Sequence, residues 1–167
     1  MEEKKILDQP SIEVIIMRMS HQVHEQFFEF EELVIVGIES QGLELANRLN
    51  QHLMEMKAFK TEVIGLSLDK HQSSRPDFRF SPPLQNLNGK PVLLVDDVLN
   101  SGRTLTYCLS PLVEFQIPRL LVAVLVERIY RKFPVSASIT GIPLSTTVEE
   151  KVVVRLSGDE TEGIYLS

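Results

Sequence analysis

Two adjacent carboxylates, Asp96 and Asp97, follow directly on a short apolar run in this 167-residue chain. The run, VLLV at 92–95, is typical of a buried strand in a parallel sheet. Because ligands bind such sheets at the carboxyl ends of their strands, we expect both aspartates to lie at the rim. There they can accept hydrogen bonds from a cis-diol and hold a divalent cation.

A small polar turn comes next and suits a phosphate group. Its backbone N–H groups, its hydroxyls and the start of a following helix can all bind an anion. We expect Gly102 to supply a positive φ or a close approach of the backbone. The alternative is an ordinary strand–helix turn, which predicts no particular order of acids, glycine and hydroxyls. The candidate phosphate-binding residues are Asn100, Ser101, Gly102, Arg103 and Thr104.

A second strand–turn–helix unit precedes this one in the chain. The apolar run LVIVGI at 33–38 predicts a buried strand, and the turn ESQG at 39–42 leads into an amphipathic helix that extends to Met56. Gly42 would let the backbone come close to a ligand at the start of that helix. A plain connection between strand and helix is the alternative.

The remaining pattern alternates strands and helices. Apolar residues at helical spacing predict a first helix that begins near Asp8 and Pro10. A third predicted helix, 104–115, contains Pro111 and should kink or end early. Alternating strands and helices joined by short turns predict a doubly wound α/β domain. Further strands are predicted at 61–68, 119–127, 138–141 and 151–156, with an edge strand at 163–166.

The composition is that of one globular domain, residues 1–167, with 43% hydrophobic and 24% charged residues. A net charge of −6 argues against a surface that binds nucleic acid throughout. The single cysteine, Cys108, is expected to be a packed apolar residue. No apolar run reaches transmembrane length, so we expect a cytoplasmic protein without a membrane partner.

A long polar passage, 69–90, separates two of the predicted strands. Loops of this length are often lids over active sites. Lys70, His71, Arg75 and Arg79 lie in it and would neutralise a pyrophosphate when such a lid closes. The alternative is a surface insertion without a role.

The stretch PVLLVDDVLNSGRTL at 91–105 resembles the phosphoribosyl pyrophosphate (PRPP) signature of type I phosphoribosyltransferases. Most of the chain resembles one branch of that family, the bifunctional pyrimidine operon attenuators with uracil phosphoribosyltransferase activity. The segments LVIVGIESQGLELANRL, VAVLVERIYRKFPV and GIPLSTTVEEKVVVRL carry this likeness. It implies a parallel sheet flanked by helices, with a small hood at 128–145.

The resemblance also implies a role for each candidate residue. The two acids would be catalytic and would hold Mg²⁺ directly or through water, and the 100–104 turn would bind the 5′-phosphate. Where the family usually has basic residues in the pyrophosphate loop, this chain has Glu39 and Gln41. Pyrophosphate would be received by Ser40, Gln41 and Gly42, and the base by Arg128 and Ile129.

The implied activity is transfer of a phosphoribosyl group from PRPP to a nucleobase, with uracil favoured, by a homo-oligomer. The alternative is a non-catalytic or weakly catalytic regulator that senses a nucleotide and binds RNA. RNA is the less favoured partner. In the resembling branch the first helix takes part in the RNA contact, and Arg18 and His21 match that region. A P-loop NTPase is excluded because the chain has no G-x-x-x-x-G-K-[ST] pattern.

Overall fold

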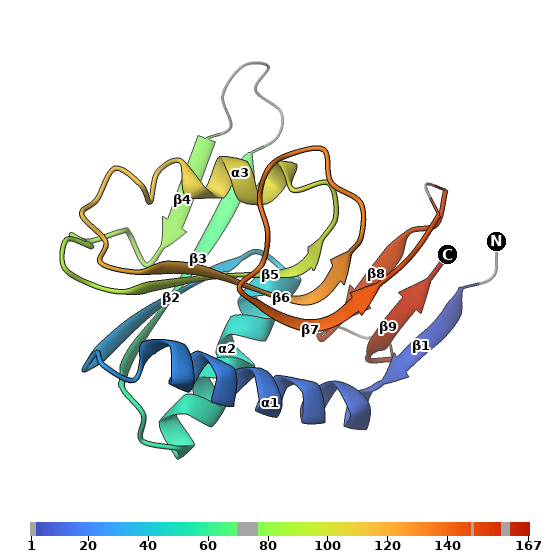
Figure 1. Ribbon diagram of the computed structural model, residues 1–167, viewed down its shortest axis with the longest axis horizontal. Helices are drawn as coiled ribbons and strands as arrows, with labels where there is room; N and C mark the ends of the chain where they lie inside the picture. The colour runs from blue at the N-terminus through green and yellow to red at the C-terminus, as the bar shows by residue number, and fades with distance from the viewer. Residues whose placement is uncertain (1–2, 70–76, 148, 158–160) are drawn as a thin grey trace.

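The computed structural model describes residues 3–69, 77–147, 149–157 and 161–167. Most of the described strands form one large sheet, and the others form a separate small sheet near the two termini (Figure 1). The order in the large sheet is β4-β3-β2-β5-β6-β7, and only β4 is antiparallel to its neighbour. This confirms the predicted α/β fold with a central, mostly parallel sheet. The strands are β2 (Glu32–Ile38), β3 (Lys60–Asp69), β4 (Asp77–Ser81), β5 (Val92–Leu99), β6 (Leu120–Arg128) and β7 (Ile139–Leu144).

Helices cover both faces of the large sheet. α1 (Gln9–Phe27) and α2 (Gln41–Glu55) lie against one face, and α3 (Arg103–Leu109) lies against the other (Figure 1). Each face has its own core of buried aliphatic side chains. Cys108 belongs to the core under α3, as expected of a packed apolar residue. None of the helices in the described part of the chain has the length and hydropathy of a membrane-spanning segment.

The helix ends follow from local sequence. At the start of α1 the carboxylate of Asp8 accepts a 3.1 Å hydrogen bond from the backbone N–H of Ser11, and Pro10 lies in the first turn. This is the predicted start. α3 ends at Leu109, two residues before Pro111, which confirms the predicted early end. Proline cannot donate a backbone hydrogen bond and crowds the turn before it.

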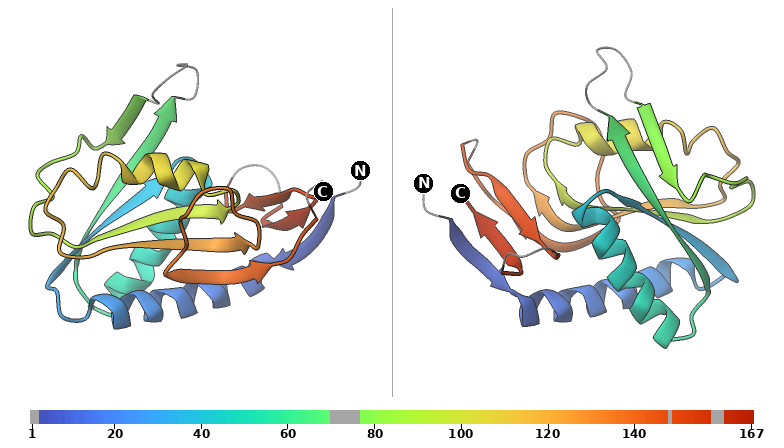
Figure 2. Two further views of the ribbon diagram at one scale, coloured as in Figure 1. Left: turned by 45° about the horizontal axis from the view of Figure 1, so that its top comes forward. Right: turned by 180° about the vertical axis from the view of Figure 1, so that it is seen from behind.

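The small sheet corrects two predictions. It has the order β1-β9-β8, with antiparallel pairs, and consists of β1 (Lys4–Asp8), β9 (Gly163–Leu166) and β8 (Val152–Arg155) (Figure 2). The prediction that 163–166 form an edge strand was wrong, because β9 lies between β8 and the unpredicted β1. The hood expected at 128–145 is also placed differently, since residues 139–144 pair with β6 as a strand of the large sheet.

The polar passage at 69–90 is not one continuous loop. Its Asp77–Ser81 segment forms β4, which pairs antiparallel with the end of β3. Phe78 and Phe80 alternate along it and pack on the core under α3, which is why this polar stretch joins the sheet. Arg79 lies on β4 with its side chain exposed. The other three predicted lid cations, Lys70, His71 and Arg75, lie outside the described residues.

Candidate functional site

The candidate site lies at the point of the large sheet where the strand order reverses. β2 pairs with β3 on one side and with β5 on the other, so consecutive segments leave it toward opposite edges. Ligands bind open α/β sheets at such a switch point, beyond the carboxyl ends of the strands. β2 and β5 are followed by residues 39–42 and 100–104, the two stretches that the sequence singled out, and each stretch includes the first two residues of the next helix.

The two acids lie within β5 rather than after it. β5 pairs with β2 only as far as Val95 but continues beside β6 to Leu99. Asp96 and Asp97 are therefore at the rim on the β2 side, although the strand runs past them. Asp96 is 7% exposed and Asp97 half-buried, and an oxygen of the first accepts a 3.0 Å hydrogen bond from the backbone N–H of the second.

Gly42 brings the start of α2 against this pair of acids. A Cβ at Gly42 would lie 2.9 Å from the carbonyl oxygen of Val95 and 3.2 Å from a side-chain oxygen of Asp96. Real Cβ atoms do not approach backbone so closely. The glycine therefore allows a close approach of α2 to β5. The predicted close approach of this backbone to a ligand stays a prediction.

The turn after β5 encloses a hollow of about 110 Å³. Gly102 has φ +87°, in the left-handed region that favours glycine. A Cβ there would also lie 2.6 Å from a methyl group of Val135. Glycine therefore fits this position, where a side chain would collide. All five predicted phosphate residues line the hollow: Asn100, Ser101, Gly102, Arg103 and Thr104.

A second hollow, of about 220 Å³, adjoins the first and is acidic. Its lining includes the carboxylates Glu39, Asp96 and Asp97. The two hollows share Asp96, Val98 and Thr104 in their linings. Among the described residues, no three His, Cys, Asp or Glu side chains come together closely enough to hold a metal ion by themselves. Oxygen ligands from a bound substrate or from water would have to complete such a site.

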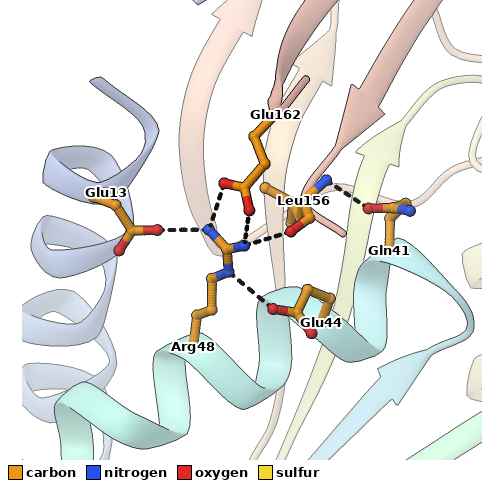
Figure 3. A network of polar contacts seen from close by, with 6 residues as sticks. All are labelled: Glu13, Gln41, Glu44, Arg48, Leu156 and Glu162. Carbon is orange, nitrogen blue, oxygen red and sulfur yellow. Dashed lines mark hydrogen bonds and ion pairs between the residues drawn. The ribbon is translucent and has the colours of Figure 1, made fainter. Parts of the chain in front are cut away.

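The predicted pyrophosphate residues do not share one environment. Ser40 is exposed and Gly42 is buried. The side-chain oxygen of Gln41 accepts a 2.7 Å hydrogen bond from the backbone N–H of Leu156, just beyond β8 (Figure 3). The amide oxygen of Gln41 is thus committed to the edge of the small sheet, and none of these three residues lines the acidic hollow.

An ion-pair network behind this turn was not predicted. The guanidinium of Arg48, on α2, contacts three carboxylates and the carbonyl oxygen of Leu156 (Figure 3). Burial opposes its charge, but hydrogen bonds to the carboxylates outweigh that effect and raise the pKa of Arg48. Only one partner, Glu44, is a helical neighbour that sequence spacing could suggest. The other two carboxylates, Glu13 and Glu162, belong to distant segments of the chain.

The predicted base residues border a third hollow, of about 530 Å³, beyond the end of β6. Its lining is Glu127, Arg128, Ile129, Tyr130, Arg131 and Pro143. Arg128 is 4% exposed, whereas Ile129 is 73% exposed and offers an apolar surface. The carboxylate of Glu127 accepts hydrogen bonds from Arg131 and from the Thr140 hydroxyl. The third hollow therefore combines the exposed apolar side chain of Ile129 with polar side chains, such as Glu127 and Arg131, that already form hydrogen bonds with each other.

Known proteins are similar in sequence to most of this chain. The chain is 32% identical over 169 residues to the bifunctional protein PyrR of Chloroflexus aurantiacus, across 97% of this chain and 92% of that protein. It is 30% identical over 159 residues to the pyrimidine operon regulatory protein of Lactococcus lactis subsp. lactis, across 94% and 92%.

Solved structures share the fold at lower identity. A hypoxanthine-guanine phosphoribosyltransferase from Bacillus anthracis superposes with a TM-score of 0.79 at 17% identity, over 97% of this chain and 96% of that one. The hypoxanthine phosphoribosyltransferase of Trypanosoma cruzi gives 0.79 at 16% identity, over 98% and 95%. The family described as phosphoribosyl transferase domain matches residues 2–156. The chain therefore belongs to the phosphoribosyltransferase family.

Proposed function

We propose that this protein transfers the 5-phosphoribosyl group of PRPP to a ring nitrogen of uracil and releases pyrophosphate. One observation carries the proposal. The phosphate hollow and the acidic hollow share Asp96 and Thr104, so a ribose held by the acids has its 5′-phosphate within reach of the 100–104 turn. The third hollow, at the end of β6, would receive the base.

In the reaction the bond from the anomeric carbon to a pyrophosphate oxygen breaks, and a bond to the base nitrogen forms. The pyrophosphate leaves with the bonding electron pair, the base nitrogen releases its proton to solvent water, and positive charge develops on the sugar ring during the step. Catalysis of this kind depends mostly on position and electrostatics. Asp96 and Asp97 would orient the ribose hydroxyls and place their negative charge beside the developing cation.

The same two carboxylates fit a Mg²⁺ ion, since hard cations take oxygen ligands and keep several waters. Asp96 and Asp97 would hold it directly or through water, together with oxygen atoms of the substrate. When bound, the metal would neutralise charge on the pyrophosphate leaving group. The carboxylate of Glu39 in the same hollow gives this neutralisation particular importance.

The choice of uracil rests on relatives, whose names include a pyrimidine operon regulatory protein. That name also supports a second candidate, a nucleotide-sensing regulator that binds RNA. The exposed Arg18 on α1 donates hydrogen bonds to Gln22 and to carbonyl oxygens of β7, at Thr140 and Gly141. RNA would have to compete for this guanidinium, which favours the transferase.

The test is an assay of the purified protein with PRPP and Mg²⁺ against uracil, guanine, hypoxanthine and orotate. Pyrophosphate release with uracil, together with formation of uridine monophosphate (UMP), is the expected result. The matched control is the Asp96→Asn/Asp97→Asn double variant, which should give no release. If the wild-type protein releases pyrophosphate with none of the bases, the transferase proposal is wrong. UMP and RNA binding would then support the regulator.

A further inference from the structure

We infer that Arg128 and Arg131, which line the hollow proposed for the base, are also positioning residues for the 5′-phosphate turn. They occupy the oxygen acceptors of Asn100, and this leaves its amide donors for the phosphate. The inference rests on the proposed phosphate site in the hollow lined by residues 100–104.

The first step in the argument is the environment of Arg128. This side chain at the end of β6 is 4% exposed, and its guanidinium donates hydrogen bonds in three directions. They reach the side-chain oxygen of Asn100 at 2.8 Å, the hydroxyl of Thr146 at 2.8 Å and the carbonyl oxygen of Thr147 at 3.0 Å. The guanidinium is thus fixed between the phosphate turn and the segment after β7.

The second step concerns the orientation of the Asn100 amide. A guanidinium has donors and no acceptor, so the amide atom that faces Arg128 must be the oxygen. The amide nitrogen, with its two hydrogens, then lies on the other branch of the side chain. Since Asn100 also lines the phosphate hollow, its nitrogen is available to an anion there. Arg128 therefore determines which end of the amide the ligand meets.

The third step is the backbone of the same turn. Arg131 donates a 3.0 Å hydrogen bond to the carbonyl oxygen of Asn100. The carbonyl oxygen of Ser101 accepts from the backbone N–H groups of Lys132 at 3.0 Å and Phe133 at 3.1 Å. Residues 128–133 thus donate hydrogen bonds to the carbonyl oxygens of Asn100 and Ser101. Oxygen atoms that would repel a phosphate are drawn away from the hollow.

The choice of asparagine at position 100 supports a ligand role. An aspartate would make a stronger pair with a buried arginine, because hydrogen bonds between ionised partners are stronger than neutral ones. It would also place a carboxylate in the phosphate hollow. With Asn100, each of the three hydrogen bonds described for Arg128 ends on a neutral oxygen. Hydrogen bonds from Thr147 lower the pKa of Glu150, and the positive charge of Arg128 also helps to lower it, so this charge acts on both Glu150 and an anion at Asn100.

The test is a calorimetric titration of UMP and of uridine, which lacks the phosphate, into the full-length protein. Asn100→Asp changes an exposed residue and should strengthen its contact with Arg128, so its melting temperature should not fall. Its affinity for UMP should drop at least ~tenfold, because a charged hydrogen bond is lost and replaced by repulsion. Arg128→Lys cannot make all three hydrogen bonds and should weaken UMP binding about fivefold. Uridine binding should stay unchanged in Asn100→Asp. In Arg128→Lys it should fall less than UMP binding, because Arg128 also lines the hollow proposed for the base.

The matched control is Arg119→Lys, the same change just before the opposite end of β6, where the arginine pairs with Glu29. It should alter neither affinity. The inference is overturned if Asn100→Asp binds UMP as tightly as the wild type, or if uridine binding falls as much as UMP binding. If the wild-type protein itself does not bind UMP, the proposed phosphate site is wrong, and this result is distinct from the previous two.

Discussion

The side-chain oxygen of Gln41 and the backbone N–H of Leu156 form a 2.7 Å hydrogen bond between the first residue of α2 and the small sheet. Two helical turns further on, Arg48 donates to the carbonyl oxygen of the same leucine. Both backbone groups of Leu156 are thus held by one face of α2 (Figure 3). The turn after β2, which borders the site, is thereby anchored to strands formed by the two ends of the chain.

This anchor predicts a stability effect. Arg48→Met removes the cation but keeps a long apolar stem, and it leaves Glu13, Glu44 and Glu162 without their shared partner. We expect the free energy of unfolding to fall by about 2 kcal/mol, measured by urea denaturation. Arg79→Met, on the exposed face of β4, is the control and should change it little. Equal effects of the two substitutions would contradict a stabilising role for the network.

Gly102→Ala should impair phosphate binding by a collision as well as by backbone strain. Its Cβ would meet Val135 at 2.6 Å. The matched control is Gly89→Ala, at φ +78° with open space around its Cβ. Strain in the left-handed region should cost each variant about 1 kcal/mol of stability. Only Gly102→Ala should also lose affinity for UMP, by ~tenfold. This loss corresponds to about 1.4 kcal/mol of binding free energy, lost because the collision displaces the turn from the phosphate. Unchanged affinity in that variant would exclude the turn from the phosphate site.

Glu39→Gln should raise the affinity of the acidic hollow for pyrophosphate. Without Mg²⁺, removal of one of its three carboxylates should raise the affinity for pyrophosphate about fivefold, because a like charge nearby is gone. With Mg²⁺ the gain should shrink. Glu55→Gln, at the far end of α2, controls for the change in net charge. If both variants gain the same affinity for pyrophosphate, Glu39 does not face the pyrophosphate.

The N-cap of α1 predicts a pH effect. Hydrogen bonds from the hydroxyl and backbone N–H of Ser11 lower the pKa of Asp8. A lowered pKa in the folded state means that the ionised cap stabilises the fold at neutral pH. That contribution is fully present above the ordinary pKa of an unfolded aspartate, about 4, and is lost as the pH falls from there through the lower folded pKa. Urea denaturation across this range should show the wild type losing its advantage over Asp8→Asn, whose cap does not titrate. A difference independent of pH would contradict this assignment.

The predictable parts of the fold are those specified by local patterns. Continuous apolar runs identified β2, β5 and β6, and the cap at Asp8 identified the start of α1. The alternation of Phe78 and Phe80 was also a signal for β4, but the polar residues around them obscured it. β1 and β9 pair across almost the whole length of the chain, and no local pattern predicts such a partner.

The site was predictable to a similar degree. Motif order was enough to select the residues at the ends of β2 and β5, because the fold brings the ends of parallel strands to one edge. It did not reveal where the side chains point. Gln41 faces Leu156, and Arg128 bonds Asn100, because these contacts depend on segments that meet only in the folded protein. Charged and amide side chains are long, and tertiary neighbours decide which of several partners they reach.

The most direct measurement of the central proposal is a calorimetric titration of PRPP with Mg²⁺ into the wild type and into Asp96→Asn/Asp97→Asn. Glu114→Gln, an exposed change away from the three hollows, is the control. We predict binding by the wild type and the control, and a loss of at least ~tenfold in the double variant with its circular dichroism spectrum unchanged, because charged hydrogen bonds to the ribose and the metal are removed. Equal affinity in all three proteins would contradict the assignment of PRPP to the acids of β5.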